Sequence, residues 1–136
     1  MAVTKNEIRV AIQSDGDILT ARQRGRELGV SLGFGPSDLA VIATAISELA
    51  RNLLLYAENG NIICWPIERG ADKGIVIQAA DEGPGIADVE AVMKDGYSTS
   101  GSLGLGLPGV RRMMDEFAIV SRKGHGTTVT TIKWLE

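Results

Sequence analysis

The segment PSDLAVIATAISELARNLLLY, residues 36–56, shows the clearest helical periodicity in the chain. Pro36, Ser37 and Asp38 are typical of a helix start, because proline fits the first turn and short polar side chains cap it. Apolar residues then recur every three or four positions, at Leu39, Ile42, Ile46, Leu49 and Leu53. This spacing places them on one helix face. The sequence therefore predicts a helix that buries that face against the rest of the fold.

The segments on either side of this helix predict strands and further helices. Strands are expected over 6–13, 61–67, 75–80, 117–122 and 127–134. Helices are expected over 15–31, 88–94 and 105–115, with a glycine-, serine- and threonine-rich loop over 95–104. Helices and strands do not alternate regularly, which favours an α+β two-layer sandwich. Its sheet would be mixed but largely antiparallel, with the helices on one face.

Composition limits the class of protein. With 136 residues, 44% of them hydrophobic and 23% charged, the chain fits one folded domain over 1–136. A net charge of −3 argues against a nucleic-acid partner, since such domains carry a basic surface. One cysteine, Cys64, and one histidine exclude an intrachain disulfide and a Cys/His metal site. We find no signal peptide and no stretch approaching a membrane span, so we expect a soluble cytoplasmic protein without membrane contact.

Glycine is concentrated in one part of the chain. Seven of the 17 glycines fall between residues 81 and 109: Gly83, Gly85, Gly96, Gly101, Gly104, Gly106 and Gly109. Such a cluster suggests unusual dihedral angles or close approach of the backbone to a ligand. The last of these glycines open the helix predicted over 105–115. A glycine-rich helix N-terminus suits phosphate, because it offers free N–H groups and the positive end of the helix dipole.

Three well-known nucleotide motifs are absent. Residues 104–109 match G-x-G-x-x-G, but no strand precedes them, so we exclude the dinucleotide-binding fingerprint. A Walker A loop is excluded because no lysine occurs between Lys94 and Lys123. The H-R-D and D-F-G motifs of eukaryotic-type kinases do not occur in the chain.

Glu48 and Asn52 stand one turn apart on the predicted helix 36–56, so their side chains share a face. A carboxylate and an amide oxygen in this arrangement suit Mg²⁺ that keeps several waters. The carboxylate of Glu48 could instead serve as a general base. The structural alternative is the edge of a helix with ordinary polar residues.

Asp81 continues the inward-facing parity of the strand predicted over 75–80. A carboxylate there needs a hydrogen-bond donor, and a purine amino group is one. The alternative is a turn cap that leads into Gly83 and Gly85. Thr127, which follows Gly126, could offer its hydroxyl to a ligand or to Asp81, or could simply follow a hairpin turn.

In order along the chain, these motifs resemble the N, G1 and G2 boxes and the terminal Gly-Thr of the GHKL (Bergerat-fold) ATPases. The motifs are Glu48-x-x-x-Asn52, Asp81-x-Gly83-x-Gly85, Gly101-x-x-Gly104-x-Gly106 and Gly126-Thr127. The segments TAISELARNLLLYA (44–57), DEGPGI (81–86), DGYSTSGSLGLGLPGVRRMMDEF (95–117) and the ending IKWLE are similar to the anti-sigma-factor-kinase branch, and within it to the stressosome serine/threonine kinases. The resemblance covers nearly the whole chain.

The resemblance implies a role for each motif residue. ATP would lie between helices and sheet, with Asp81 bonded to the adenine amino group and Thr127 in support. Asn52 would coordinate Mg²⁺, and Glu48 would act as the base toward the incoming hydroxyl. Gly83 and Gly85 would make room for the adenine. Residues 95–104 would form a mobile lid. Three glycines would line the phosphates: Gly101, Gly104 and Gly106.

The resemblance also implies partners and an activity. The activity would be ATP-dependent phosphorylation of Ser or Thr residues on STAS-domain stressosome scaffold proteins. After release from them, the kinase would bind and switch on a PP2C-type phosphatase or another output protein. One alternative is a non-catalytic, nucleotide-binding anti-sigma-type switch that sequesters a partner, and another is plain ATP hydrolysis. The complete set of Glu48, Asn52 and Asp81 favours the kinase.

Overall fold

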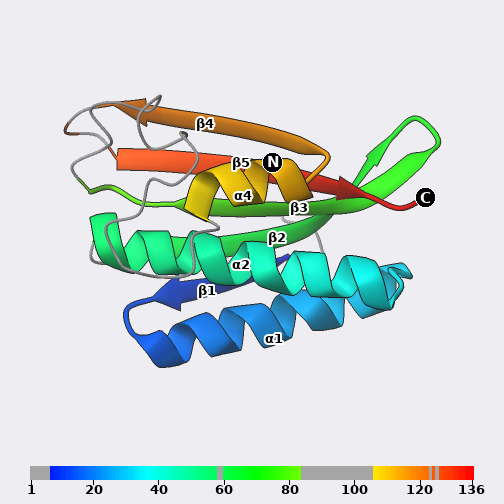
Figure 1. Ribbon diagram of the computed structural model, residues 1–136, viewed down its shortest axis with the longest axis horizontal. Coiled ribbons are helices and arrows are strands. Elements are labelled where there is room, and N and C mark those ends of the chain that lie inside the picture. The colour runs from blue at the N-terminus through cyan, green and yellow to red at the C-terminus, as the bar shows by residue number, and fades with distance from the viewer. Residues whose placement is uncertain (1–6, 58–59, 84–105, 123, 125) are drawn as a thin grey trace.

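The fold is known from a computed structural model that describes residues 7–57, 60–83, 106–122, 124 and 126–136. In chain order these residues form β1 (Ile8–Ile12), α1 (Asp15–Leu32), α2 (Pro36–Tyr56), β2 (Gly60–Arg69), β3 (Asp72–Ala80), α4 (Gly106–Met113), β4 (Glu116–Arg122) and β5 (Gly126–Trp134). Figure 1 shows α1, α2 and α4 together on one face of the sheet. The expected two-layer α+β sandwich is confirmed. The helix expected over 88–94 and the lid expected over 95–104 lie outside the described residues.

The sheet has the strand order β1-β2-β3-β5-β4. Each of its four described pairings is antiparallel, in agreement with the largely antiparallel sheet expected from the sequence. The β2–β3 hairpin is longer than predicted, because its register continues to the pair Arg69↔Asp72. Its turn is therefore short, and Gly70 adopts a φ of 64°, which favours glycine. The charged residues of this hairpin tip concealed the strand pattern in the sequence.

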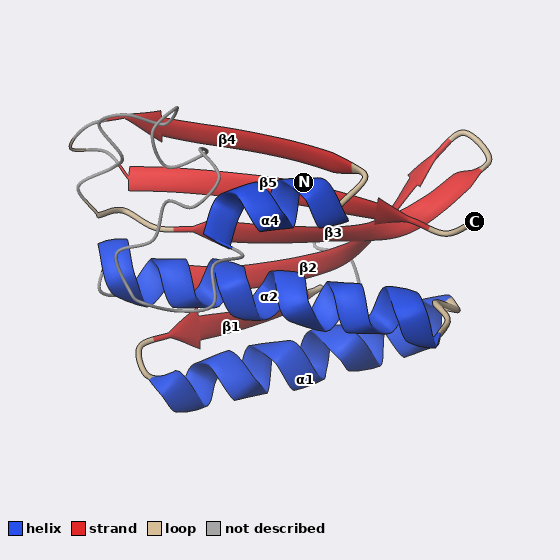
Figure 2. Cartoon of the chain, viewed as in Figure 1, coloured by secondary structure: helices blue, strands red, loops and turns tan. Residues whose placement is uncertain are grey.

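The core lies between the helical layer and the sheet, and α2 occupies the middle of the layer (Figure 2). All five residues of its predicted apolar stripe are buried. The inner face of the sheet contributes buried Ile12, Ile62, Cys64 and Ile77. Burial raises the pKa of the Cys64 thiol to about 12, although nearby Arg24 acts in the opposite direction. This thiol therefore stays protonated at neutral pH and packs as a small apolar group.

Two glycines allow α1 and α2 to approach closely. A Cβ on Gly25 would overlap the side chain of Ile46, and a Cβ on Gly29 would lie 2.8 Å from Leu39 Cδ2. Glycine costs backbone entropy within a helix, and here the cost is offset by closer packing. Helix α1 is capped at its C-terminal end by Gly33, whose φ of 98° is left-handed.

By length and composition, α2 could cross a membrane, with a mean hydropathy of 1.4. It is the only such helix among the described residues, and it corrects the expectation that no stretch approaches a membrane span. Here α2 is a core helix, because it packs against α1, α4 and the strands through its buried stripe. Its polar residues, Glu48 and Asn52 among them, lie beside that stripe and not in it.

Candidate functional site

A pocket lies between α2, α4 and the inner face of β3 and β5. Three of the residues predicted from the sequence line it together: Asn52, Asp81 and Thr127. The other lining residues are mostly apolar: Leu49, Leu53, Tyr56, Ala79, Leu107 and Val129. A few polar groups that converge on an apolar cavity are typical of a small-molecule site.

Asn52 brings an amide into the pocket from α2. Its Nδ2 atom is buried and has no hydrogen-bond partner among the described residues. A buried amide without a partner is costly, so the position calls for an acceptor from a ligand. The same helix also supplies Leu49, Leu53 and Tyr56, at helical spacing, to the pocket wall.

Asp81 lies at the end of β3, where the chain turns toward Gly83. Its backbone N–H donates to the Thr127 carbonyl over 3.0 Å. Its Oδ1 atom accepts hydrogen bonds from the Gly83 N–H (2.8 Å) and the Thr127 N–H (3.3 Å). Asp81 therefore caps this turn and also faces the pocket. None of the hydrogen bonds between described residues uses Oδ2.

Close backbone approach explains two glycines of the motifs. A Cβ on Gly83 would lie 2.9 Å from the Cβ of Ala57, at the end of α2. A Cβ on Gly126 would overlap the backbone oxygen of Asp81, and Gly126 has a left-handed φ of 94°. Both glycines therefore let neighbouring segments meet at Asp81.

Ser121, which no sequence motif indicated, supports Thr127 from β4. The two hydroxyl oxygens lie 2.7 Å apart in one hydrogen bond. Strand register could have suggested this contact, because Ser121 and Thr127 pair directly across β4 and β5. The apolar wall was also missed, although Tyr56 stands one helical turn beyond Asn52 and Leu107 follows Gly106.

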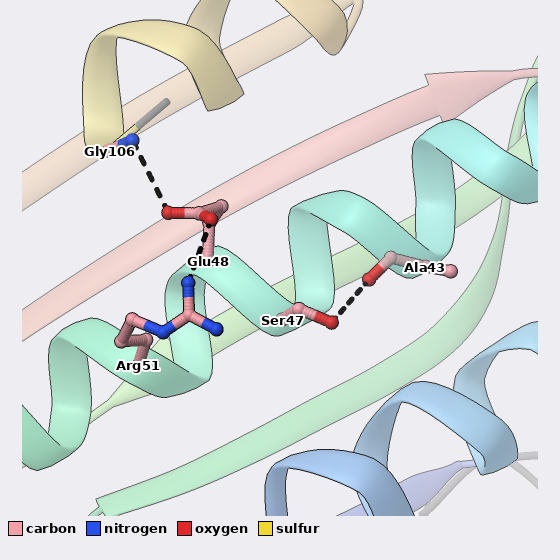
Figure 3. A network of polar contacts seen from close by, with 5 residues as sticks. All are labelled: Ala43, Ser47, Glu48, Arg51 and Gly106. Carbon is pink, nitrogen blue, oxygen red and sulfur yellow. Dashed lines mark hydrogen bonds and ion pairs between the residues drawn. The ribbon is translucent and has the colours of Figure 1, made fainter. Parts of the chain in front are cut away.

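Glu48 lies near this pocket without lining it, and both of its carboxylate oxygens have partners (Figure 3). Its Oε1 accepts from Arg51 Nη1 over 3.1 Å, and its Oε2 accepts from the Gly106 N–H over 3.3 Å. The side chain of Glu48 is only 13% exposed. Glu48, the predicted base, thus contacts Gly106, which is the only predicted phosphate-lining glycine among the described residues. Gly85, Gly101 and Gly104 lie outside the described residues.

In the described parts of the chain, no group of three or more His, Cys, Asp or Glu residues could hold a metal ion. Mg²⁺ fits this arrangement, because it is commonly held by one or two protein oxygens together with substrate phosphates and water. The amide oxygen of Asn52, a residue of the pocket wall, is a protein oxygen of the kind that such a ligand set uses.

A second, wider hollow lies by the β2–β3 hairpin and the end of α1. None of the residues predicted from the motifs lines it. The chemistry that the sequence indicates is therefore concentrated in the pocket beside α2.

Comparison with known proteins finds one family and several relatives. The model of the histidine kinase-, DNA gyrase B- and HSP90-like ATPases matches residues 37–136. The chain is 54% identical to the serine/threonine-protein kinase RsbT of Bacillus subtilis (strain 168), over 93% of this chain and 95% of that one. It is 33% identical to an anti-sigma F factor of Caldanaerobacter subterraneus subsp. tengcongensis, over 72% and 71% of the two chains. An anti-sigma F factor of Clostridium acetobutylicum is 32% identical, over 95% and 92%.

Proposed function

Since the chain belongs to the histidine kinase-, DNA gyrase B- and HSP90-like ATPase family, we propose that it is an ATP-dependent protein serine/threonine kinase. The observation that carries this proposal is the convergence of Asn52, Asp81 and Thr127 on one apolar pocket. The high identity to a serine/threonine-protein kinase over nearly the whole chain supports protein, and not water, as the phosphate acceptor.

The adenine of ATP would occupy the apolar part of the pocket. Asp81 Oδ2 would accept a hydrogen bond from the adenine amino group, while Oδ1 keeps its bonds to Gly83 and Thr127. The Thr127 hydroxyl, held by Ser121, would support this contact. Leu53 and Val129 would pack on the purine ring from opposite layers of the fold.

The phosphates would extend toward the N-terminus of α4. The Gly106 N–H lies there, and we propose that Gly101 and Gly104 also line the phosphates, with Gly83 and Gly85 beside the purine. Asn52 would hold Mg²⁺ through its amide oxygen. When bound, Mg²⁺ supplies neutralisation of phosphate charge, which is the main requirement of phosphoryl transfer together with positioning.

Glu48 would act as the general base in the transfer. The acceptor hydroxyl oxygen forms a bond to the γ-phosphorus, and the bond from that phosphorus to the bridging oxygen breaks, so that ADP leaves. The proton of the hydroxyl passes to the Glu48 carboxylate. The Gly106 contact supports this assignment, because it places Glu48 beside the helix end where phosphate would bind.

We further propose STAS-domain stressosome proteins as the acceptors and a PP2C-type phosphatase, or another output protein, as the later partner. These partners follow from the likeness of residues 44–57 and 95–117 to the stressosome kinases. We also propose that residues 1–136 act as one domain in the cytoplasm. A second candidate function is a non-catalytic nucleotide-dependent switch that sequesters a partner, which the anti-sigma F factor relatives favour.

The variant Glu48→Gln separates these two functions. We expect it to transfer phosphate about 10²- to 10⁴-fold more slowly, because a general base contributes that much. ATP affinity should not fall, since Gln removes a negative charge beside the proposed phosphate site. The assay follows labelled phosphate from ATP to a purified STAS-domain protein, with ATP binding measured by calorimetry.

Glu68→Gln is a matched control, since Glu68 lies 71% exposed on the β2–β3 hairpin. It should transfer at the wild-type rate. Equal transfer by Glu48→Gln and wild type would exclude Glu48 as the base. ATP binding by the wild type without transfer to any STAS-domain protein would favour the switch.

A further inference from the structure

The carboxylate of Glu48 is held from two sides by groups of different kinds. Gly106 belongs to α4 and offers a backbone N–H, whereas Arg51 belongs to α2 and stands three residues after Glu48. Figure 3 shows the guanidinium of Arg51 and the amide of Gly106 reaching different oxygens of the same carboxylate. The proposed function gives Arg51 no role.

The Gly106 contact and phosphate binding compete for the same donor. An amide at a helix N-terminus attracts anions, and in the structure the anion in contact is Glu48 itself. A phosphate that takes this amide removes the hydrogen bond from Glu48 Oε2. It also repels the carboxylate, since both groups are negative.

Once that bond is lost, Arg51 is the remaining partner of the Glu48 carboxylate among the described residues. Its hydrogen bond to Oε1 would keep the carboxylate beside the phosphates and leave Oε2 facing the acceptor hydroxyl. We propose, on the basis of the function proposed above, that Arg51 is a positioning residue that holds Glu48 in place for phosphoryl transfer.

A contribution to folding does not account for this contact. The side chain of Arg51 is 41% exposed, and ion pairs at such positions add little to stability. The guanidinium also differs from an ammonium group, because its planar array of donors fixes the direction of a carboxylate. A positioning role therefore predicts that Arg51→Gln lowers the rate of phosphoryl transfer and that Arg51→Lys lowers it less.

The test compares wild type, Arg51→Gln, Arg51→Lys, Glu48→Gln and the double variant Glu48→Gln/Arg51→Gln. Each is incubated with labelled ATP, Mg²⁺ and a purified STAS-domain protein, and kcat is separated from the KM for that protein. We expect kcat to fall on the order of 10- to 100-fold in Arg51→Gln, as displacement of a reacting group does. Arg51→Lys should recover part of this loss, and ATP affinity and thermal unfolding should stay near wild type.

The double variant gives a readout that a merely structural role would not. If Arg51 acts through Glu48, then Arg51→Gln should lower the residual transfer of Glu48→Gln by no more than about twofold. Arg9→Gln is the control, because Arg9 is an exposed arginine of β1. It should behave as wild type.

The failures are distinguishable. The role of Arg51 would be excluded if Arg51→Gln kept the wild-type kcat. It would also be excluded if Arg51→Gln lowered kcat equally in the wild-type and Glu48→Gln backgrounds. The proposed kinase activity would be unaffected by either result. A loss confined to ATP affinity or to the KM for the STAS-domain protein would also overturn the role of Arg51, since Arg51 would then bind a substrate directly. Absence of transfer by the wild type would overturn the proposed function and this inference together.

Discussion

Asp81 shows how one side chain can build a turn and still serve a ligand. Its Oδ1 closes the turn to Gly83 and bonds the backbone of Thr127, so this oxygen is committed to the protein. The charge of the carboxylate is thereby satisfied in part by the fold itself. No hydrogen bond between described residues uses its Oδ2, and Asp81 lines the pocket. Because only Oδ1 accepts these hydrogen bonds, a substitution that changes Oδ2 alone can test ligand binding.

The variant Asp81→Asn tests the proposed adenine contact. Asparagine can keep the Oδ1 hydrogen bonds, but it replaces Oδ2 with an NH₂ group that faces the adenine amino group as a second donor. We expect ATP affinity to fall about 10- to 100-fold, since a hydrogen bond to a charged group contributes about 1.5–3 kcal/mol. Calorimetry measures this loss.

Asp72→Asn provides the control, because Asp72 is exposed at the β2–β3 turn and should leave ATP affinity unchanged. Circular dichroism would show that both variants are folded. Unchanged ATP affinity in Asp81→Asn would rule out the adenine contact.

At the scale of elements, the site depends on the start of β5 lying against the end of β3. Gly126 begins β5 and touches the backbone of Asp81, which leaves no room for a Cβ. Its left-handed φ of 94° adds a second requirement for glycine. Thr127 is thereby brought to the Asp81 carboxylate.

We expect Gly126→Ala to destabilise the protein by at least about 2 kcal/mol, because both a left-handed backbone and a steric overlap oppose the new methyl group. ATP affinity of the folded fraction should also fall, since Asp81 must shift. Urea denaturation and calorimetry measure the two effects.

Gly33→Ala separates the two causes. Gly33 has a similar φ of 98°, yet a Cβ there would meet nothing within 4 Å. It should cost about 1 kcal/mol, from backbone conformation alone, and leave ATP affinity unchanged. Equal destabilisation by the two variants would show that the approach to Asp81 does not matter.

At the scale of the whole molecule, residues of both the helical layer and the sheet line the pocket. Asn52 and Leu53 belong to the helical layer, whereas Asp81 and Val129 belong to the sheet side. A ligand that contacts both layers binds the folded state and not the unfolded chain. Its binding must therefore stabilise the fold.

We expect ATP with Mg²⁺, at 100 times its Kd, to raise the free energy of unfolding by about 2.7 kcal/mol. EDTA should reduce this gain, because the phosphates would lose the Mg²⁺ that we propose Asn52 holds. GTP should give a smaller gain than ATP, because guanine presents a carbonyl where adenine presents the amino group to Asp81. Thermal unfolding in each nucleotide measures these differences. Equal shifts with ATP, GTP and ATP plus EDTA would contradict this binding mode.

Much of the site was already determined by the local sequence. Helical spacing predicted the buried stripe of α2 and put Glu48 and Asn52 on one face, since the period of a helix depends only on neighbouring residues. Strand parity likewise predicted the inward position of Asp81. The order of the motifs indicated the family that the comparisons then identified.

Tertiary structure alone decided how these pieces meet. The contacts of Asp81 with Thr127 and of Glu48 with Gly106 join residues 46 and 58 positions apart in the chain. The close approach at Gly25 and at Gly126 likewise depends on the path of a distant segment. Local periodicity carries no information about such distances, because they are set by the packing of α2 and α4 on the sheet. The sequence therefore indicated which residue types form the candidate site, and only the tertiary structure determined which of them contact one another.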